Sequence, residues 1–158
     1  KFINFLYWLN KKYKQKIIIS THFRTRDRLI KSKTKLNKLQ KNNEKNILFL
    51  QPFGFSDYVK LQKECKIIFS DSGTLTEESS LLSLKAIKLR TSHERPEGME
   101  ESSTIMCGLN IEKIKSAIDI LEKTNKSKIV NEYSVNNFSD KIIKNIISYL
   151  DYSINKKI

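Results

Sequence analysis

The sequence predicts an α/β fold with a Rossmann-like parallel β-sheet and helices on both of its faces. Short apolar runs rich in β-branched residues alternate along the chain with amphipathic segments, which is the pattern of successive βαβ units. The run Ile17-Ile18-Ile19 is apolar throughout, as expected of a parallel strand that is covered on both faces. At 158 residues the chain has the length of one domain, which we place at residues 1–158.

The first predicted element is a helix, because Phe2, Phe5, Leu6 and Leu9 recur at the helical i, i+3, i+4, i+7 spacing. The sequence has no initiating Met and opens inside this helix. We therefore expect that a longer protein precedes Lys1 and that the first strand of the sheet belongs to that preceding part.

Further elements follow in the order of the chain. Apolar runs predict strands at residues 16–21, 47–50, 66–69, 86–89 and 104–107. Amphipathic segments predict helices at residues 26–40, 58–64, 74–84, 111–121 and 139–152. Ser56 and Asp57 are expected to cap the helix at 58–64, and Asn110 the helix at 111–121, because short polar side chains accept hydrogen bonds from first-turn amides. Residues 125–137 are expected to be a loop, and the last helix is expected to close the domain.

The composition excludes several classes of protein. The net charge of +13 is spread along the chain, and no recognition helix, RNA-binding motif or zinc motif accompanies it, so we expect no nucleic-acid partner. No apolar run approaches the roughly 20 residues of a membrane span and no signal peptide is visible, which predicts a cytoplasmic protein without a membrane partner. Cys65 and Cys107 are expected to be buried, reduced thiols without metal spacing, and no residue requires a cofactor.

Ser72-Gly73-Thr74 lies where a predicted strand turns into the N-terminus of a predicted helix. Free backbone N–H groups and the positive end of a helix dipole suit a phosphate at such a turn. Glycine also lets the backbone approach a ligand closely. Ser and Thr are common N-caps as well, so an ordinary capped turn explains the same residues, and local chemistry leaves both interpretations open.

Other candidate site residues follow the remaining strands, where ligands of open α/β sheets bind. His22 follows the first strand, although a lone His in such a place is more often structural. Phe53, Phe55 and Tyr58 follow the second strand and either stack on a nucleobase or pack into the core. The segment 90–101 holds two Arg, one His and four Glu, and a polar loop of this density is typical of a functional site.

Four motifs together resemble the non-hydrolysing UDP-N-acetylglucosamine 2-epimerase family. They are STHFRTR at 20–26, PFGFSDY at 52–58, DSGTLTEE at 71–78 and HERPEGME at 93–100. They cover nearly the whole chain in the expected order. The extended motif HERPEGMEE and the tail YSVNN at 133–137 look most like the capsule and O-antigen branch, which makes UDP-N-acetyl-L-fucosamine by epimerising a UDP-2-acetamido-2,6-dideoxy-L-talose.

The resemblance implies a GT-B architecture, in which two Rossmann-like domains hold the nucleotide sugar in the cleft between them, and this chain resembles the second domain. It implies that the DSG turn binds the UDP phosphates, that Glu78 holds the ribose hydroxyls and that Arg95 contacts the nucleotide sugar. It also places an aromatic side chain beside the uracil. The matching positions of the site in this sequence are Ser72, Gly73, Thr74, Glu78, Arg95, Tyr58, Phe53 and, weakly, His22.

The sequence departs from the family at two informative positions. Phe53 stands where plain epimerases have Gln, and Phe23 stands where the capsule branch usually has Pro. The family's catalytic carboxylates and its HRE-type histidine belong to the part before Lys1, so the catalytic residues of this chain remain unassigned.

For the intact enzyme the resemblance implies elimination and re-addition of UDP on a UDP-activated amino sugar, without a cofactor or metal, and a possible homodimer. This chain would supply UDP binding and would be inactive alone. The alternatives are the UDP-sugar-binding half of a GT-B glycosyltransferase and a non-catalytic remnant.

Overall fold

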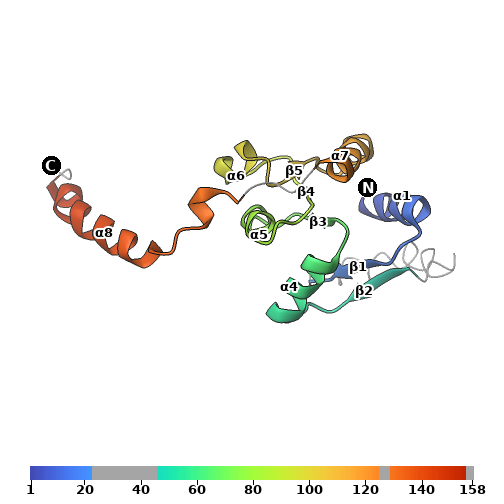
Figure 1. Ribbon diagram of the computed structural model, residues 1–158, viewed down its shortest axis with the longest axis horizontal. Coiled ribbons are helices and arrows are strands. Elements are labelled where there is room, and N and C mark those ends of the chain that lie inside the picture. The colour runs from blue at the N-terminus through green and yellow to red at the C-terminus, as the bar shows by residue number, and fades with distance from the viewer. Residues whose placement is uncertain (23–45, 125–128, 156–158) are drawn as a thin grey trace.

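The computed structural model describes residues 1–22, 46–124 and 129–155, so the predicted helix at 26–40 lies outside the described residues. The strands are β1 (Ile17–Ser20), β2 (Ile47–Leu50), β3 (Ile68–Ser70), β4 (Ala86–Lys88) and β5 (Ile105–Met106). The helices are α1 (Phe2–Tyr13), α4 (Phe55–Glu64), α5 (Leu75–Leu82), α6 (Pro96–Glu100), α7 (Ile111–Lys123), the 3-10 helix η1 (Asn131–Tyr133) and α8 (Phe138–Asn155). Figure 1 shows their arrangement.

All strand pairings recorded among the described residues are parallel, which confirms the predicted sheet type. β1 pairs with β2, and β4 lies between β3 and β5, so the described strands form a two-stranded and a three-stranded sheet. The two sheets share one hydrophobic core, because Ile19 of β1, Phe49 of β2 and Phe69 of β3 all pack against the same buried cluster. Parallel strands place their carboxyl ends at one edge, and the candidate residues at 72–74 and 95 follow β3 and β4 at that edge.

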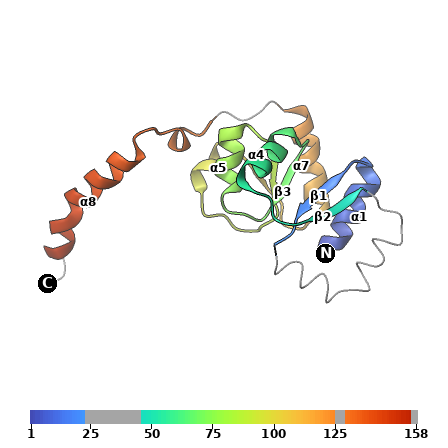
Figure 2. The same cartoon turned by 90° about the horizontal axis from the view of Figure 1, so that it is seen from below.

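Helices cover both faces of the three-stranded sheet. Successive side chains of a strand point to opposite faces. Ile87 of β4 is fully buried in a cluster with side chains of α1 and α7, whereas the next residue, Lys88, reaches Thr76 of α5. In Figure 2, α4 and α5 accordingly lie on one side of β3 and α7 lies on the other. The predicted α/β architecture is confirmed.

The predicted first helix is also confirmed, together with the face that it buries. Phe5, Leu6 and Leu9 of α1 are buried. The ring of Phe5 meets that of Phe69 edge-on, with 5.2 Å between the ring centroids, and such a contact adds about 0.5–1.5 kcal/mol to the burial of the two rings. Helix α1 is therefore an integral part of the core.

Of the two predicted helix caps, the one for α7 is confirmed and the one for α4 is wrong. Asn110 Oδ1 accepts a hydrogen bond of 3.1 Å from the backbone N–H of Lys113, which confirms it as the cap of α7. The prediction for α4 is wrong: Gly54 occupies the N-cap position with an extended backbone, and Ser56 and Asp57 lie inside the first turn. Asp57 still suits that position, because a carboxylate in the first turn interacts favourably with the helix dipole.

Two further predictions need correction. Cys65, at the C-terminal end of α4, is exposed and not buried, and its Sγ donates a hydrogen bond of 3.2 Å to the carbonyl oxygen of Gln62. Cys107 is buried as predicted. The segment 90–101 is not a loop throughout, since it contains the short helix α6. Pro96 begins this helix, as its fixed φ favours at a first helical position.

Helix α8 is longer than predicted by one residue at its start and three at its end. It projects away from the rest of the molecule (Figure 1), and the large apolar side chains along it are exposed, including Ile143, Ile146 and Ile147. The closing contact expected of this helix is therefore not seen within the described chain. Among the described helices, none is both long and apolar enough to cross a membrane.

Candidate functional site

The turn between β3 and α5 is held by short hydrogen bonds between its own side chains. The Ser70 hydroxyl oxygen accepts a bond of 3.0 Å from the backbone N–H of Ser72, and the hydroxyls of Ser72 and Thr74 lie 2.9 Å apart. Thr74 occupies the N-cap position, yet its side chain makes no capping hydrogen bond to a backbone N–H of the first turn of α5. The amides of that turn therefore remain available to an anion, which favours the phosphate interpretation over the capped turn.

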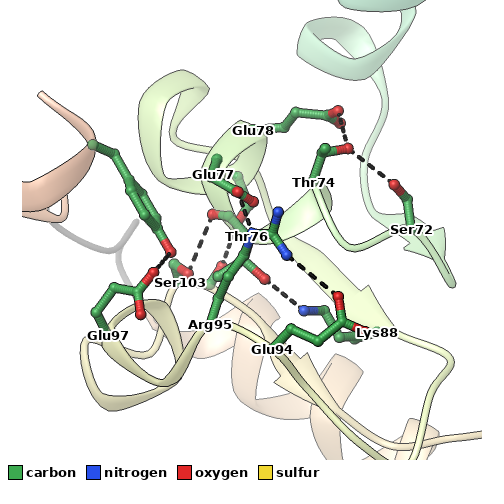
Figure 3. A network of polar contacts seen from close by, with 12 residues as sticks. Ser72, Thr74, Thr76, Glu77, Glu78, Lys88, Glu94, Arg95, Glu97 and Ser103 are labelled. Carbon is green, nitrogen blue, oxygen red and sulfur yellow. Dashed lines mark hydrogen bonds and ion pairs between the residues drawn. The ribbon is translucent and has the colours of Figure 1, made fainter. Parts of the chain in front are cut away.

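Glu78 is fixed by hydrogen bonds from two different elements. Its Oε1 accepts a hydrogen bond of 2.8 Å from the Thr74 hydroxyl (Figure 3). Its Oε2 accepts one of 2.5 Å from Nε2 of Gln62, which is buried on α4. Tyr58 lies one turn before Gln62, and burial together with the negative charge of Glu78 raises the pKa of its hydroxyl. The carboxylate thus stands between α4 and the turn with both oxygens oriented.

Arg95 is held by carboxylates on two sides. Its Nε forms an ion pair with Oε1 of Glu77, and its Nη1 lies 3.6 Å from Oε2 of Glu94. The hydrogen bond that Arg95 donates to Glu77 is the main cause that raises the pKa of Arg95. Glu94 in turn accepts a hydrogen bond of 2.9 Å from Arg90 Nη2. The guanidinium is therefore positioned before any ligand arrives, which is the arrangement suited to recognising a planar or phosphate oxyanion.

Gly73 and Arg95 meet directly. A Cβ added at Gly73 would lie 3.1 Å from Arg95 Nη1 and 3.6 Å from Glu94 Oε2. The guanidinium therefore lies against the backbone of the turn, and glycine is the residue that permits this approach. An anion at the turn would meet backbone N–H groups and a fixed guanidinium together.

The remaining predicted residues follow the carboxyl ends of β1 and β2 along the chain. Phe53 is half-buried in the segment after β2, Phe55 is 85% exposed at the start of α4, and His22 is exposed directly after β1. Phe55 is thus not a core residue. For Phe53 and Tyr58, stacking on a nucleobase and packing into the core both remain open. The contacts described above join Ser72, Thr74 and Glu78, and bring Gly73 to Arg95.

Sequence reasoning missed three residues of this network, which are Gln62, Glu77 and Lys88. Each is joined to its partner by tertiary structure: Gln62 to Glu78, Glu77 to Arg95, and Lys88 to Thr76. The one available signal was a lysine inside an apolar strand, since such a residue is almost never buried without a partner. Within the described ranges, no group of three or more His, Cys, Asp or Glu lies close enough together to hold a metal ion.

Comparison with known proteins identifies the family. The sequence profile of UDP-N-acetylglucosamine 2-epimerase matches residues 1–147. The chain belongs to the UDP-N-acetylglucosamine 2-epimerase family. Within this family, the 2-epimerase of Methanocaldococcus jannaschii is 35% identical over 140 residues, which are 89% of this chain and 37% of that protein. The family resemblance seen in the motifs is thereby confirmed, while the fucosamine branch is not.

Solved structures of family members agree with the fold. The 2-epimerase of Rickettsia bellii superposes with a TM-score of 0.79 at 38% identity, covering 99% of this chain and 42% of that one. The M. jannaschii enzyme in complex with UDP-GlcNAc and UDP superposes with a TM-score of 0.76 at 32% identity, covering 94% of this chain and 40% of that one. The chain thus spans about 40% of the length of these epimerases.

Proposed function

We propose that this chain is the UDP-binding part of a UDP-2-acetamido-sugar 2-epimerase. The observation that carries the proposal is the contact of Arg95 with the turn at Gly73. This contact places a guanidinium beside the first backbone N–H groups of α5, which no side chain caps. Support also comes from the M. jannaschii relative, whose structure holds UDP-GlcNAc and UDP. In this proposal Ser72, Gly73 and Thr74 bind the pyrophosphate.

Glu78 is proposed to bind the ribose. Its two oxygens face different donors in the present structure, and a carboxylate with two oriented oxygens can accept hydrogen bonds from two vicinal hydroxyls. Thr74 would exchange its bond to Glu78 for a bond to the ligand. Tyr58 and Phe53 are proposed to line the uracil, with His22 as a weaker candidate.

The reaction proposed for the whole protein is elimination followed by re-addition. A base removes the C2 proton, the C1–O bond breaks, and UDP leaves with the bonding electron pair, which yields a glycal-like intermediate. UDP then re-adds at C1 while a proton is delivered to the opposite face of C2. Because negative charge grows on the departing pyrophosphate, Arg95 and the amides of the turn stabilise the transition state more than the bound substrate.

The groups that move the proton are proposed to lie in the part of the relatives' length that this chain does not span. The chain alone would then bind UDP without epimerising it. We further propose the capsule and O-antigen branch, on the motif HERPEGMEE and the tail at 133–137. A cytoplasmic homodimer, as the resemblance implies, completes the proposal.

The proposal is tested by calorimetric titration of the chain with UDP and, separately, with inorganic pyrophosphate. Arg95→Ala should weaken both ligands by about 10- to 100-fold, the effect of losing a hydrogen bond to a charged group. Glu78→Ala should weaken UDP alone, because pyrophosphate has no ribose. Lys63→Ala and Glu64→Ala, at exposed positions near the end of α4, are matched controls that should change neither affinity. Unchanged UDP affinity in both site variants would refute the assignment.

A further inference from the structure

Lys88 is a buried lysine beneath the candidate site. It is the last residue of β4, and its side chain is turned towards α5, where Nζ lies 2.5 Å from the Thr76 hydroxyl. Lys88 is 1% exposed and Thr76 is fully buried. A charged ammonium at such a place needs compensating partners, because its transfer from water is strongly unfavourable. Thr76 is a neutral partner and supplies no compensating charge.

Charged groups of both signs influence Lys88. Arg90 and Arg95 repel its charged form, whereas Glu77 and Glu94 attract it. The hydrogen-bond partner of its Nζ is the neutral Thr76 hydroxyl, so a proton on Lys88 meets no carboxylate in that bond. Its partner Thr76 also lies in the first turn of α5, at the positive end of that helix dipole. Burial, followed by repulsion from Arg95 and Arg90, accordingly lowers the pKa of Lys88.

We propose that Lys88 is a buried third cation of the anion site, and that it takes up a proton when the pyrophosphate of a nucleotide sugar binds at the Ser72-Gly73-Thr74 turn. This inference rests on the proposed function. A bound pyrophosphate brings negative charge to the cluster, and an opposite charge nearby in a poorly solvated site favours the charged form of a lysine. The proton comes from solvent, and no covalent bond forms or breaks.

Lys88 is a positioning residue and not a catalytic one, because its side chain is buried and does not reach the surface where a ligand binds. It acts through Thr76, which joins it to the first turn of α5, and through its charge (Figure 3). The charged form stabilises the anion, and the neutral form keeps the unliganded site from holding excess charge. Binding should therefore weaken as pH rises, because the lysine proton becomes harder to acquire.

The experiment is calorimetry of the chain with UDP-GlcNAc in two buffers of different ionisation enthalpy. Its pyrophosphate diester exchanges no proton near neutral pH, but its uracil N3–H also titrates in the alkaline range, so the uptake assigned to Lys88 is the difference between the wild-type chain and Lys88→Met. We expect the wild-type chain to take up a fraction of a proton that is larger at about pH 9 than at about pH 7. Lys88→Met should lower this uptake and weaken binding by about tenfold, roughly the effect of losing one favourable charge. Lys85→Met, which changes the lysine just before the same strand, should leave both the proton uptake and the binding affinity unchanged.

The outcomes separate the two proposals. Binding without proton uptake, or equal uptake by Lys88→Met and the wild-type chain, overturns the role of Lys88 and leaves the UDP site standing. A complete absence of binding overturns the UDP site and this inference with it. Should Lys88→Met fail to fold, the wild-type chain decides by NMR: the Lys88 side-chain resonance must titrate at higher pH with UDP-GlcNAc than without it, and an unchanged titration overturns the inference.

Discussion

Arg95 and Glu77 form an ion pair that ties the segment before α6 to the first turn of α5. Both side chains are mostly covered, at 27% and 28% exposure, so the pair is shielded from solvent more than a surface ion pair is. Glu77 therefore orients the guanidinium that lies against Gly73.

The first prediction follows from this pair. Glu77→Ala should weaken UDP binding by about fivefold, because Arg95 must then be immobilised when the ligand binds, at about 1 kcal/mol. Titration calorimetry measures the change. Glu77→Gln should weaken binding less, since its amide oxygen still accepts from Arg95 Nε. If Glu77→Ala binds UDP as tightly as the wild-type chain, Glu77 does not position Arg95.

The second prediction concerns Gly98 in α6, where an added methyl group has no space. A Cβ at this buried position would lie 2.1 Å from Cγ2 of Thr76 and 2.9 Å from the hydroxyl of Tyr133. We expect Gly98→Ala to lower the free energy of unfolding by about 1–3 kcal/mol, as overpacking does, measured by urea denaturation. Gly54→Ala is the comparison without a clash, because an added methyl there meets no atom of the described chain within 4 Å; it should cost only the difference between Gly and Ala as the N-cap of α4.

A double variant identifies the clash as the cause. Thr76→Ser removes Cγ2 and keeps the hydroxyl that accepts from Lys88. Combined with Gly98→Ala, it should restore part of the lost stability, which appears as a coupling energy between the two positions. Simple additivity of the two single changes would show that the contact with Thr76 is not responsible.

The third prediction concerns the exposed apolar stripe of α8. Contiguous apolar surface of this kind promotes association. The described chain leaves Ile143 at 55%, Ile146 at 59% and Ile147 at 69% exposure. We expect the chain to self-associate at tens of micromolar, and Ile143→Glu with Ile147→Glu to make it monomeric, as light scattering after gel filtration would show. Lys144→Glu, a charge change on the same helix, is the control; equal behaviour of all three proteins would contradict the prediction.

The fourth prediction is a pH dependence of stability. The pKa of Lys88 is lowered in the folded chain, chiefly by burial, from its usual 10.5. Between the two values the unfolded chain holds a proton that the folded chain lacks, so Lys88 contributes a rise of the free energy of unfolding with pH just below 10.5. Urea denaturation at a series of alkaline pH values should therefore give a more positive slope of this free energy against pH in the wild-type chain and in Lys85→Met than in Lys88→Met. Equal slopes in all three proteins would contradict it.

Local signals predicted much of the fold. The spacing of Phe5, Leu6 and Leu9 identified α1 and its buried face, and the Asn110 cap was correct because both of its partners lie within one helical turn. The start of α4 was wrong because Gly54, extended and without a side-chain cap, begins that helix in place of the more usual Ser or Asp. The five residues of α6 are too few for a periodic pattern to reveal.

The network within the site was less predictable. Sequence motifs predicted the turn at Ser72-Gly73-Thr74 together with Glu78 and Arg95. The contacts of Glu77 and Lys88 were not predicted, because Glu77 lies 18 positions from Arg95 and Lys88 lies 12 positions from Thr76. Such pairs depend on how β4 is placed beside β3, and no local rule encodes that placement. The exposure of Cys65 was missed for a related reason, because proximity to a strand says nothing about where a side chain at a helix end turns.

The hydroxyl of Tyr133 donates a hydrogen bond of 2.8 Å to Glu97 of α6, and the backbone N–H of Val130 donates one of 2.8 Å to Ser80 of α5. The segment that leads into α8 is therefore fastened at two points to the helices that carry Arg95 and Glu77 at their starts. Helix α8 has 18 residues and a length of about 27 Å, and it follows this fastened segment. A displacement of α6 would be passed to the segment at Tyr133, so we expect a fluorophore attached near the start of α8 to report events at Arg95.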